Sequence, residues 1–320
     1  MNEVRMPALT GDSPLGILAA IGVLRLLSEF TEARTRLRWN RSDLTAVLCG
    51  PHDDIDAVVA DLAAIVAGID EGASLPGVGA GFPPPGAAPD GLRVPQARLS
   101  SATQPLVRDM SDAQRGEALR WLSSLVTDLA ADDKGRVAIS QFAAPSGKQS
   151  MATMLDKPLE QIRKEPDHLR QAMVGWRRVA GVTGEYLDHR AMWDATEDGA
   201  GSPSMRGVPG ATWLALMSYP LLRTTVSSRR RPLSSGWHAV KVNGSRPYDE
   251  LRLPVWEQPL GTAGITALIE HPALSKVGGR PGPAGKQDDL VALGIVHVCR
   301  ARRYQPPGGK SAGVLTPVRS

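Results

Sequence analysis

The chain has 320 residues, of which 42% are hydrophobic, so it can bury the core of one large domain or of two ordinary ones. Its two cysteines, Cys49 and Cys299, form no CxxC pair and no metal-ligand spacing, which argues against a disulfide framework or a zinc site and favours a cytoplasmic location. The net charge of +4 is unevenly divided: residues 1–222 hold 22 basic and 27 acidic groups, a balance of −5, and the remainder carries the basic excess.

The first 70 residues predict a strand, a helix, two strands and a second helix. The strands are expected over 4–9, 37–39 and 44–48, with a polar turn at 40–43. The second helix has acidic groups in its first turn and apolar residues three and four apart. This order is most of a ferredoxin-like unit. The predicted fold class is therefore α+β, with a ferredoxin-like or related N-terminal portion, a helical middle and a mixed α/β C-terminal portion.

The first helix begins at Gly11-Asp12-Ser13, a sequence that also opens one group of serine hydrolases. Those hydrolases carry a downstream Gly-x-Asn-Asp block and a late Asp-x-x-His block, and neither occurs here. Pro14 is typical of a helix start, because a proline at the first helical position sacrifices no intrahelical hydrogen bond and the preceding serine can cap a first-turn amide. We predict that Ser13 is a cap and not a nucleophile.

The helix that follows Pro14 is apolar almost all round and is predicted to lie deep in the core. Its longest apolar run, Leu15 to Leu24, is ten residues, too short to cross a bilayer, so no membrane association is expected. Gly16 and Gly22 would allow another backbone to pack closely against it.

The rest of the chain divides by composition. Residues 71–105 are predicted as a Gly/Pro-rich loop, mobile over 71–95. Residues 106–184 are predicted as helical, with Ser111 as a cap and interruptions near Pro158 and Pro166. Residues 185–320 are predicted as a basic mixed α/β portion with helices around 213–219 and 262–270. These portions could also form one continuous domain.

Basic side chains gather in the C-terminal third, as expected for a protein that meets an anionic partner. Guanidinium groups pair bidentately with phosphate, and the nearby Trp237, Tyr248 and Tyr304 offer surfaces for stacking against bases or sugars. The alternative is a set of charged surface loops. The candidate nucleic-acid-binding residues are Arg229, Arg230, Arg231, Lys241, Arg300, Arg302, Arg303 and Lys310.

Motifs for catalysis are incomplete. Gly309-Lys310-Ser311 and Gly147-Lys148 both lack the first glycine of a phosphate-binding loop. His52-Asp53-Asp54 resembles a metal-binding pair but is better explained by acids at a helix N-terminus. We predict no catalytic residue, no metal and no cofactor, and hence not an enzyme.

Several blocks in a fixed order resemble a family of CRISPR-associated proteins from type I-G systems, formerly called I-U. They are GDSPLGILAAIGVLRLL, MWDATEDGAGSPSMRGVPGATWLALMSYPLLRTT, GWHAV, ELRLPVWEQPL and CRARRYQ. The resemblance implies antiviral defence in a prokaryotic cytoplasm, together with a CRISPR RNA-guided (Cascade) effector complex and its helicase-nuclease. It also implies similarity at the N-terminus to the large effector subunit. The chain lacks the phosphate-loop, DEAD-box-like and histidine-aspartate blocks of the helicase-nuclease itself.

Two functions are therefore expected. The first is a non-catalytic effector component whose C-terminal third contacts target DNA or guide RNA while the N-terminal core docks on other effector subunits. The alternative is a protein adaptor that recruits the helicase-nuclease without touching nucleic acid, with Trp213 and Trp256 as partner-binding anchors.

Overall fold

The computed structural model describes residues 2–84, 91–143, 150–193, 205–227, 230–240, 247–277, 285–305 and 313–318. The structure combines helices with sheets whose strands pair antiparallel, so the α+β class predicted from the sequence is confirmed. In these ranges, no helix combines the length and the apolar character needed to span a membrane.

The N-terminal strands form a three-stranded antiparallel sheet in the order β1-β3-β2, with helix α1 crossing between β1 and β2. This is the strand order expected for the first three strands of a ferredoxin-like unit. Within the described ranges no fourth strand joins this sheet. Its elements are β1 (Asn2–Thr10), α1 (Pro14–Phe30), β2 (Arg36–Trp39), β3 (Thr45–Gly50) and α2 (Ile55–Ala67).

Residues 71–95 contain no helix or strand where they are described, but they are packed and not the mobile loop predicted. Leu75, Phe82 and Leu92 are buried in the main core. The apolar side chains spaced among the glycines and prolines explain this packing, because each fills part of the core. Residues 85–90 lie outside the described ranges.

The middle of the chain is helical with one unpredicted hairpin. The predicted break near Pro166 is confirmed, but α5 continues through Pro158, whose neighbours Leu155, Leu159 and Ile162 are buried along one helix face. The elements are α3 (Leu99–Val107), α4 (Asp112–Leu125), β4 (Val126–Ala131), β5 (Val137–Ile139), α5 (Met151–Lys164), α6 (His168–Val174), β6 (Val179–Ala180), α7 (Arg190–Trp193) and β7 (Arg206–Gly207).

The C-terminal part forms a four-stranded antiparallel sheet in the order β10-β11-β12-β13. A short hairpin of β8 and β9 precedes it, and α9 and α10 follow β11. The elements are α8 (Pro209–Met217), β8 (Thr224–Val226), β9 (Pro232–Ser234), β10 (Trp237–Val240), β11 (Tyr248–Trp256), α9 (Thr262–Ile269), α10 (Gly285–Ala292), β12 (Ile295–Tyr304) and β13 (Val314–Pro317). Single 3₁₀ turns cover Gln96–Arg98, Gly184–Tyr186, Tyr219–Leu221 and Pro272–Lys276.

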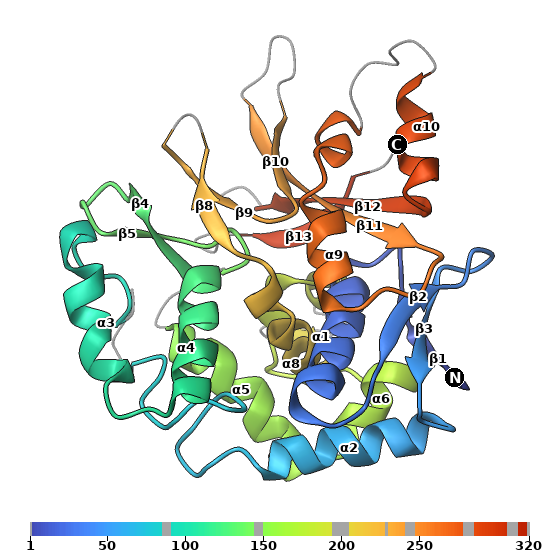
Figure 1. Cartoon of the computed structure of the whole chain (residues 1–320), viewed down its shortest axis with the longest axis horizontal. Helices are drawn as coiled ribbons and strands as arrows, with labels where there is room; N and C mark the ends of the chain where they lie inside the picture. Colours follow the sequence, from blue (N-terminus) through green and yellow to red (C-terminus); the bar gives the residue numbers. More distant parts are fainter. Residues whose placement is uncertain are drawn as a thin grey trace, which may run out of the picture.

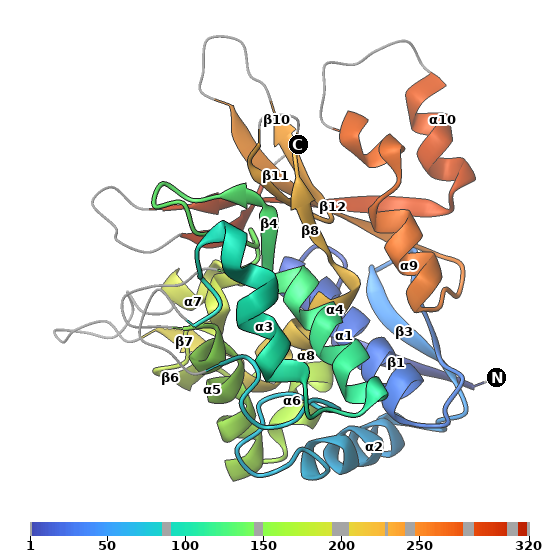
Figure 2. The same ribbon diagram turned by 60° about the vertical axis from the view of Figure 1, so that its left-hand side comes forward.

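Helices α1 and α8 cross at the centre of the molecule, with the C-terminal sheet on one side and α2, α5 and α6 on the other (Figures 1 and 2). The crossing is close because a Cβ added to Gly22 would lie 1.7 Å from the carbonyl oxygen of Leu214. The prediction that Gly22 permits close backbone packing is confirmed. One hydrophobic cluster contains residues from all four portions predicted above, so they share a core in the described structure.

Candidate nucleic-acid interface

The C-terminal sheet has one face toward the core and one away from it. In β11, Leu251, Leu253 and Val255 point to the core, and in β12 their cross-strand neighbours include Cys299 and Ala301, all buried. Because side chains alternate along a strand, the intervening residues point to the opposite face. We call this second set the outer face: Tyr248, Glu250, Arg252, Arg300, Arg302 and Tyr304.

A buried carboxylate organises the centre of the outer face. Arg300 donates two hydrogen bonds of 2.9 Å to the two oxygens of Glu250, and Arg252 Nε donates a third at 2.7 Å. Burial alone would raise the pKa of Glu250, but the hydrogen bonds from Arg300 and Arg252 hold it below its ordinary value. Arg252 is anchored further through bonds to the carbonyl oxygens of Leu274 and Ser275. Glu250 is therefore ionised and fixes two arginines.

The outer face is more open and partly aromatic at the end where β11 begins and β12 finishes. Arg302 is exposed, and its Cζ lies 5.8 Å from the centroid of the Tyr248 ring. Tyr304 is 48% exposed, which is unusual for so large an apolar surface. Among the described residues Arg302 has no carboxylate partner. This end of the outer face combines an exposed guanidinium that can pair with phosphate and two rings on the same side of the sheet.

His238 of β10 is paired with Glu250 across the β10–β11 ladder. Burial lowers the pKa of His238 to about 4, and the nearby Arg252 cation contributes in the same direction. The imidazole is thus neutral at pH 7. The three arginines and one glutamate of the outer face leave an excess of two positive charges (3 − 1 = 2).

Arg303 was predicted to bind nucleic acid, and the structure contradicts this. It points to the core side of β12, where its guanidinium donates to the carbonyl oxygens of Gln141, Phe142 and Gly313 at 2.9 to 3.2 Å. Burial lowers the pKa of Arg303 to about 10. The side chain is a charged clamp between β12 and the segment after β5. The cause is strand alternation, which sends Arg300 and Arg302 one way and Arg303 the other.

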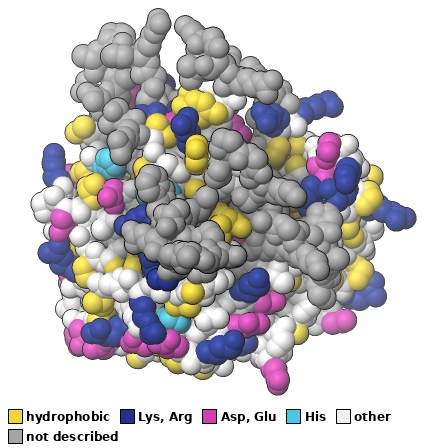
Figure 3. All heavy atoms as spheres, turned by 180° about the vertical axis from the view of Figure 1, so that it is seen from behind, with side chains coloured by type: hydrophobic (Ala, Val, Ile, Leu, Met, Phe, Trp, Pro, Cys, Tyr) yellow, Lys and Arg dark blue, Asp and Glu magenta, His cyan; other side chains and the backbone are white. Residues whose placement is uncertain are grey.

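The structure describes only some of the other basic residues that were predicted to bind nucleic acid. Arg230 and Arg231 are exposed at the turn of the β8–β9 hairpin, which points to the same end of the molecule as the β10–β11 hairpin (Figures 1 and 2). Arg229, Lys241 and Lys310 lie outside the described residues. Seen from behind (Figure 3), Lys and Arg side chains are interspersed with Asp and Glu over the described surface and form no continuous basic field.

The tryptophans predicted as partner anchors are buried. Trp213 and Trp256 have no exposed surface. Trp256 donates from Nε1 to the carbonyl oxygen of Leu37 at 2.8 Å and packs edge-on against Trp39, which joins the two sheets. Trp237 is also inside, against Phe142. These indoles hold the core together, so neither Trp213 nor Trp256 is an exposed anchor as predicted.

The sequence motifs considered for catalysis have structural roles here. Ser13 Oγ accepts a hydrogen bond from the Gly16 amide at 3.3 Å, and Pro14 begins the helix, so the predicted cap is confirmed. Asp54 caps α2 through the Ala57 amide at 2.9 Å, and His52 lies 2.9 Å from Asp61. No cluster of three or more metal-ligating side chains occurs in the part of the chain that the structure describes.

The structure also contains a buried ion-pair cluster that was not predicted from the sequence. Arg25, in the middle of apolar α1, is fully buried and forms an ion pair with Glu117 of α4. Its Nε lies 2.9 Å from Glu29 Oε2, and its Nη1 donates to the carbonyl oxygen of Met217 at 2.9 Å. Arg120 bonds to both glutamates from the surface side. We call Arg25, Glu29, Glu117 and Arg120 the central cluster; it ties α1, α4 and α8 together.

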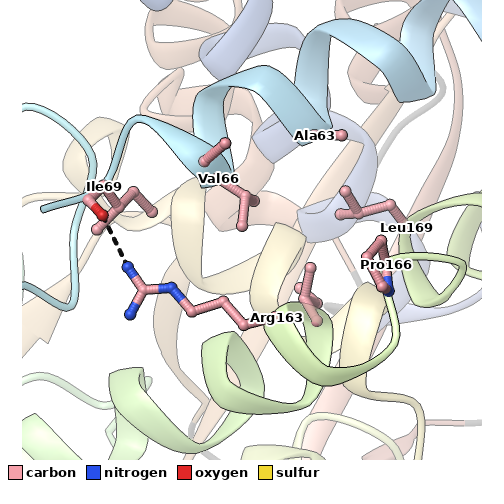
Figure 4. Close-up of a pocket in the computed structure, with 8 residues that line it drawn as sticks. Ala63, Val66, Ile69, Arg163, Pro166 and Leu169 are labelled. Carbon is pink, nitrogen blue, oxygen red and sulfur yellow. Dashed lines mark hydrogen bonds between the residues drawn. The ribbon is translucent and has the colours of Figure 1, made fainter. Parts of the chain in front are cut away.

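A pocket of about 220 Å³ lies between the end of α2 and the α5–α6 turn (Figure 4). Its floor includes the buried side chains of Val66, Ile69 and Leu169. Arg163 crosses its edge and donates to the carbonyl oxygen of Ile69 at 2.8 Å. This pocket suits an apolar group, whereas groups that pair with phosphate and stack on bases gather on the outer face.

Comparisons with known proteins yield no assignment for the chain: no family model and no curated protein sequence matches it.

Proposed function

We propose that this protein is a non-catalytic component of a type I-G-like CRISPR interference system. In this role it contacts target DNA or guide RNA through the outer face and docks on other effector subunits in a prokaryotic cytoplasm. The observation that carries the nucleic-acid role is the arrangement of Arg302, Tyr248 and Tyr304. The Arg302 guanidinium, which has no carboxylate partner among the described residues, lies over the Tyr248 ring, and the exposed Tyr304 is two residues further along the same strand of a sheet whose centre is fixed by Glu250.

The sequence resemblance supports the same proposal from a different direction. The blocks GWHAV, ELRLPVWEQPL and CRARRYQ fall on β10, β11 and β12, the three neighbouring strands that carry the outer face. The first block falls on α1, and part of the second falls on α8, the two helices that cross at the centre. The resemblance thus includes both the core and the candidate surface.

The nucleic-acid role is tested on the purified full chain by fluorescence anisotropy with labelled oligonucleotides. We expect Arg302→Glu to weaken binding at least tenfold, because it replaces a phosphate partner by a repelling charge. Arg34→Glu is the matched control, since Arg34 is exposed near β2 and undergoes the same charge change. Equal affinities for wild type and Arg302→Glu would remove the outer face from the proposal.

The CRISPR role is tested by purifying the tagged chain from cells that express the neighbouring CRISPR subunits. After nuclease treatment, gel filtration should show the protein together with a guide-RNA complex. Elution with the helicase-nuclease alone would favour the adaptor function. The partner surface of such an adaptor would then lie elsewhere, because Trp213 and Trp256 are buried in the core. Elution as a free protein would overturn the proposed system.

A further inference from the structure

We propose that the outer face binds single-stranded, not double-stranded, nucleic acid, with bases stacked on Tyr304 and Tyr248 and the backbone paired with Arg302. This inference rests on the proposed function and specifies the kind of strand. The chemistry is shared by single-stranded RNA and single-stranded DNA, so both are included as probes.

The two rings belong to one platform. Glu250 and Arg252 of β11 lie in register with the outer-face residues of β12, as the pairing of Arg252 with Arg300 shows. Tyr248 is four residues before Arg252 and Tyr304 four residues after Arg300, so both tyrosines fall on the same side of the sheet. The β11–β12 pairing ends at Leu251 and Ala301, and beyond it Arg302, two residues before Tyr304, reaches the Tyr248 ring.

The platform has the composition that unpaired bases require. Every base presents a π-face to an aromatic ring when it is not already stacked within a duplex. Tyr304 exposes nearly half of its surface, whereas Trp237 and Phe142 are packed within the core. A four-stranded sheet with exposed aromatic side chains is also one of the common surfaces on which single strands stack two or three bases.

The shape of the sheet disfavours a duplex. Four strands spaced about 4.8 Å apart span about 14 Å between the outer two, and the major groove of B-DNA is about 12 Å wide. A four-stranded sheet therefore does not enter the groove face-on as a helix or a two-stranded ribbon does. A duplex could meet the outer face only through its phosphates.

The charge on the outer face is also too small for phosphate pairing alone. Its excess of two positive charges predicts a slope of log affinity against log salt of about −1.4 for a single strand. Arg300 contributes little free donor capacity, since Glu250 holds it at two points and its side chain is only 17% exposed. A measurable affinity at moderate salt must include a part that does not depend on salt, and base stacking supplies it.

The test uses the full chain with three labelled probes, a 12-nucleotide oligothymidylate, a 12-nucleotide oligouridylate and a 12-base-pair DNA duplex, by anisotropy at several salt concentrations. We expect Tyr304→Ala to weaken single-strand binding by roughly 5- to 150-fold, the cost of losing one stacked base. Tyr304→Phe should retain it, because the ring is kept. Leu129→Ala is the control for truncating an exposed large side chain away from the outer face, on β4.

A covalent readout locates the contact. A probe with 5-iodouracil in the single strand should cross-link to Tyr304 or Tyr248 on irradiation, and mass spectrometry identifies the peptide. Duplex binding as tight as single-strand binding, or Tyr304→Ala binding like wild type, would overturn the inference. If Arg302→Glu still abolishes binding in that case, the proposed function stands without it. If no probe binds the wild-type chain, both the single-strand inference and the proposed nucleic-acid role are overturned.

Discussion

Two arginine clusters in this molecule use the same pairing chemistry with different charge balance. The central cluster sets two arginines against two glutamates, with Arg25 fully buried between three helices. The outer face sets three arginines against Glu250 alone and leaves Arg302 exposed over Tyr248. A buried charge needs an opposite charge beside it within the protein. Exposed positive charge is solvated by water and remains able to pair with an anionic ligand. The balance of carboxylates therefore separates the cluster that holds the fold from the one that can bind.

The largest effect on stability is expected when a carboxylate is removed from the central cluster. Glu117→Gln leaves Arg25 buried with a weaker set of partners and should lower the free energy of unfolding by about 3 kcal/mol. Gln is chosen because it keeps an acceptor for Trp121 Nε1, which donates to Glu117 at 2.9 Å. Urea unfolding followed by circular dichroism measures the change.

Two further variants sharpen that result. Asp112→Asn lies on the same helix with a 99% exposed side chain and should leave stability unchanged. The double variant Arg25→Met/Glu117→Gln should recover most of the loss, because removing both charges also removes the cost of burying them. A double variant less stable than Glu117→Gln would show that Arg25 matters through packing and not through its charge.

The corresponding change on the outer face should have a mixed effect. Glu250→Gln leaves Arg252 and Arg300 beside each other without a carboxylate, and we expect a loss of about 2 kcal/mol, less than in the central cluster because Arg300 reaches solvent. The same change raises the positive excess by one charge. The salt slope for single strands should therefore steepen by about 0.7. Anisotropy of the folded variant tests this, and a shallower slope would contradict the charge assignment.

His238 gives the outer face a pH dependence that the central cluster does not share. Its folded pKa of about 4 lies below the ordinary 6.5, so the unfolded chain binds more protons. The stability that comes from the neutral imidazole is present above pH 6.5 and is lost as the pH falls toward 4. Between pH 7 and 5 we expect a loss of about 1 kcal/mol, discounted for solvent that reaches the ring.

The measurement is urea unfolding of wild type and His238→Gln at pH 7 and pH 5. The loss should be smaller in the variant, because glutamine does not titrate. Glu250 faces the same ring, but its lowered pKa places its own effect at more acidic pH. A pH dependence identical in the two proteins would exclude His238 as the source.

Short-range sequence patterns predicted many of the helices and strands. The elements that were not predicted depend on contacts between segments that are separate in the sequence. The strands β1 to β3, the cap at Ser13 and the capping box at Ser111 follow from short-range signals. The strand β4 lies within the portion predicted as helical. Leu122, Leu125 and Val126 continue a helical spacing, and only pairing with β5 makes the segment extended.

The candidate site shows the same limit. Alternation along β12 would have separated Arg303 from Arg300 and Arg302 once the strand was assigned. The partner of Arg300 is Glu250, fifty positions away, and the partner of Arg25 is Glu117, 92 positions away. No local pattern shows these pairs. The basic residues could therefore be identified from the sequence, but not which of them are paired with a carboxylate in the folded protein.

The smallest expected effect on stability is also the most informative about function. Arg302→Gln removes an exposed cation over Tyr248 and should change the free energy of unfolding by only about 0.5 kcal/mol. The same variant should weaken single-strand binding several-fold, with Arg34→Gln unchanged in both measurements. Glu117→Gln should behave in the opposite way, less stable but equal in affinity per folded molecule. If Arg302→Gln instead unfolds the protein while Glu117→Gln loses binding, charge balance does not distinguish the two clusters.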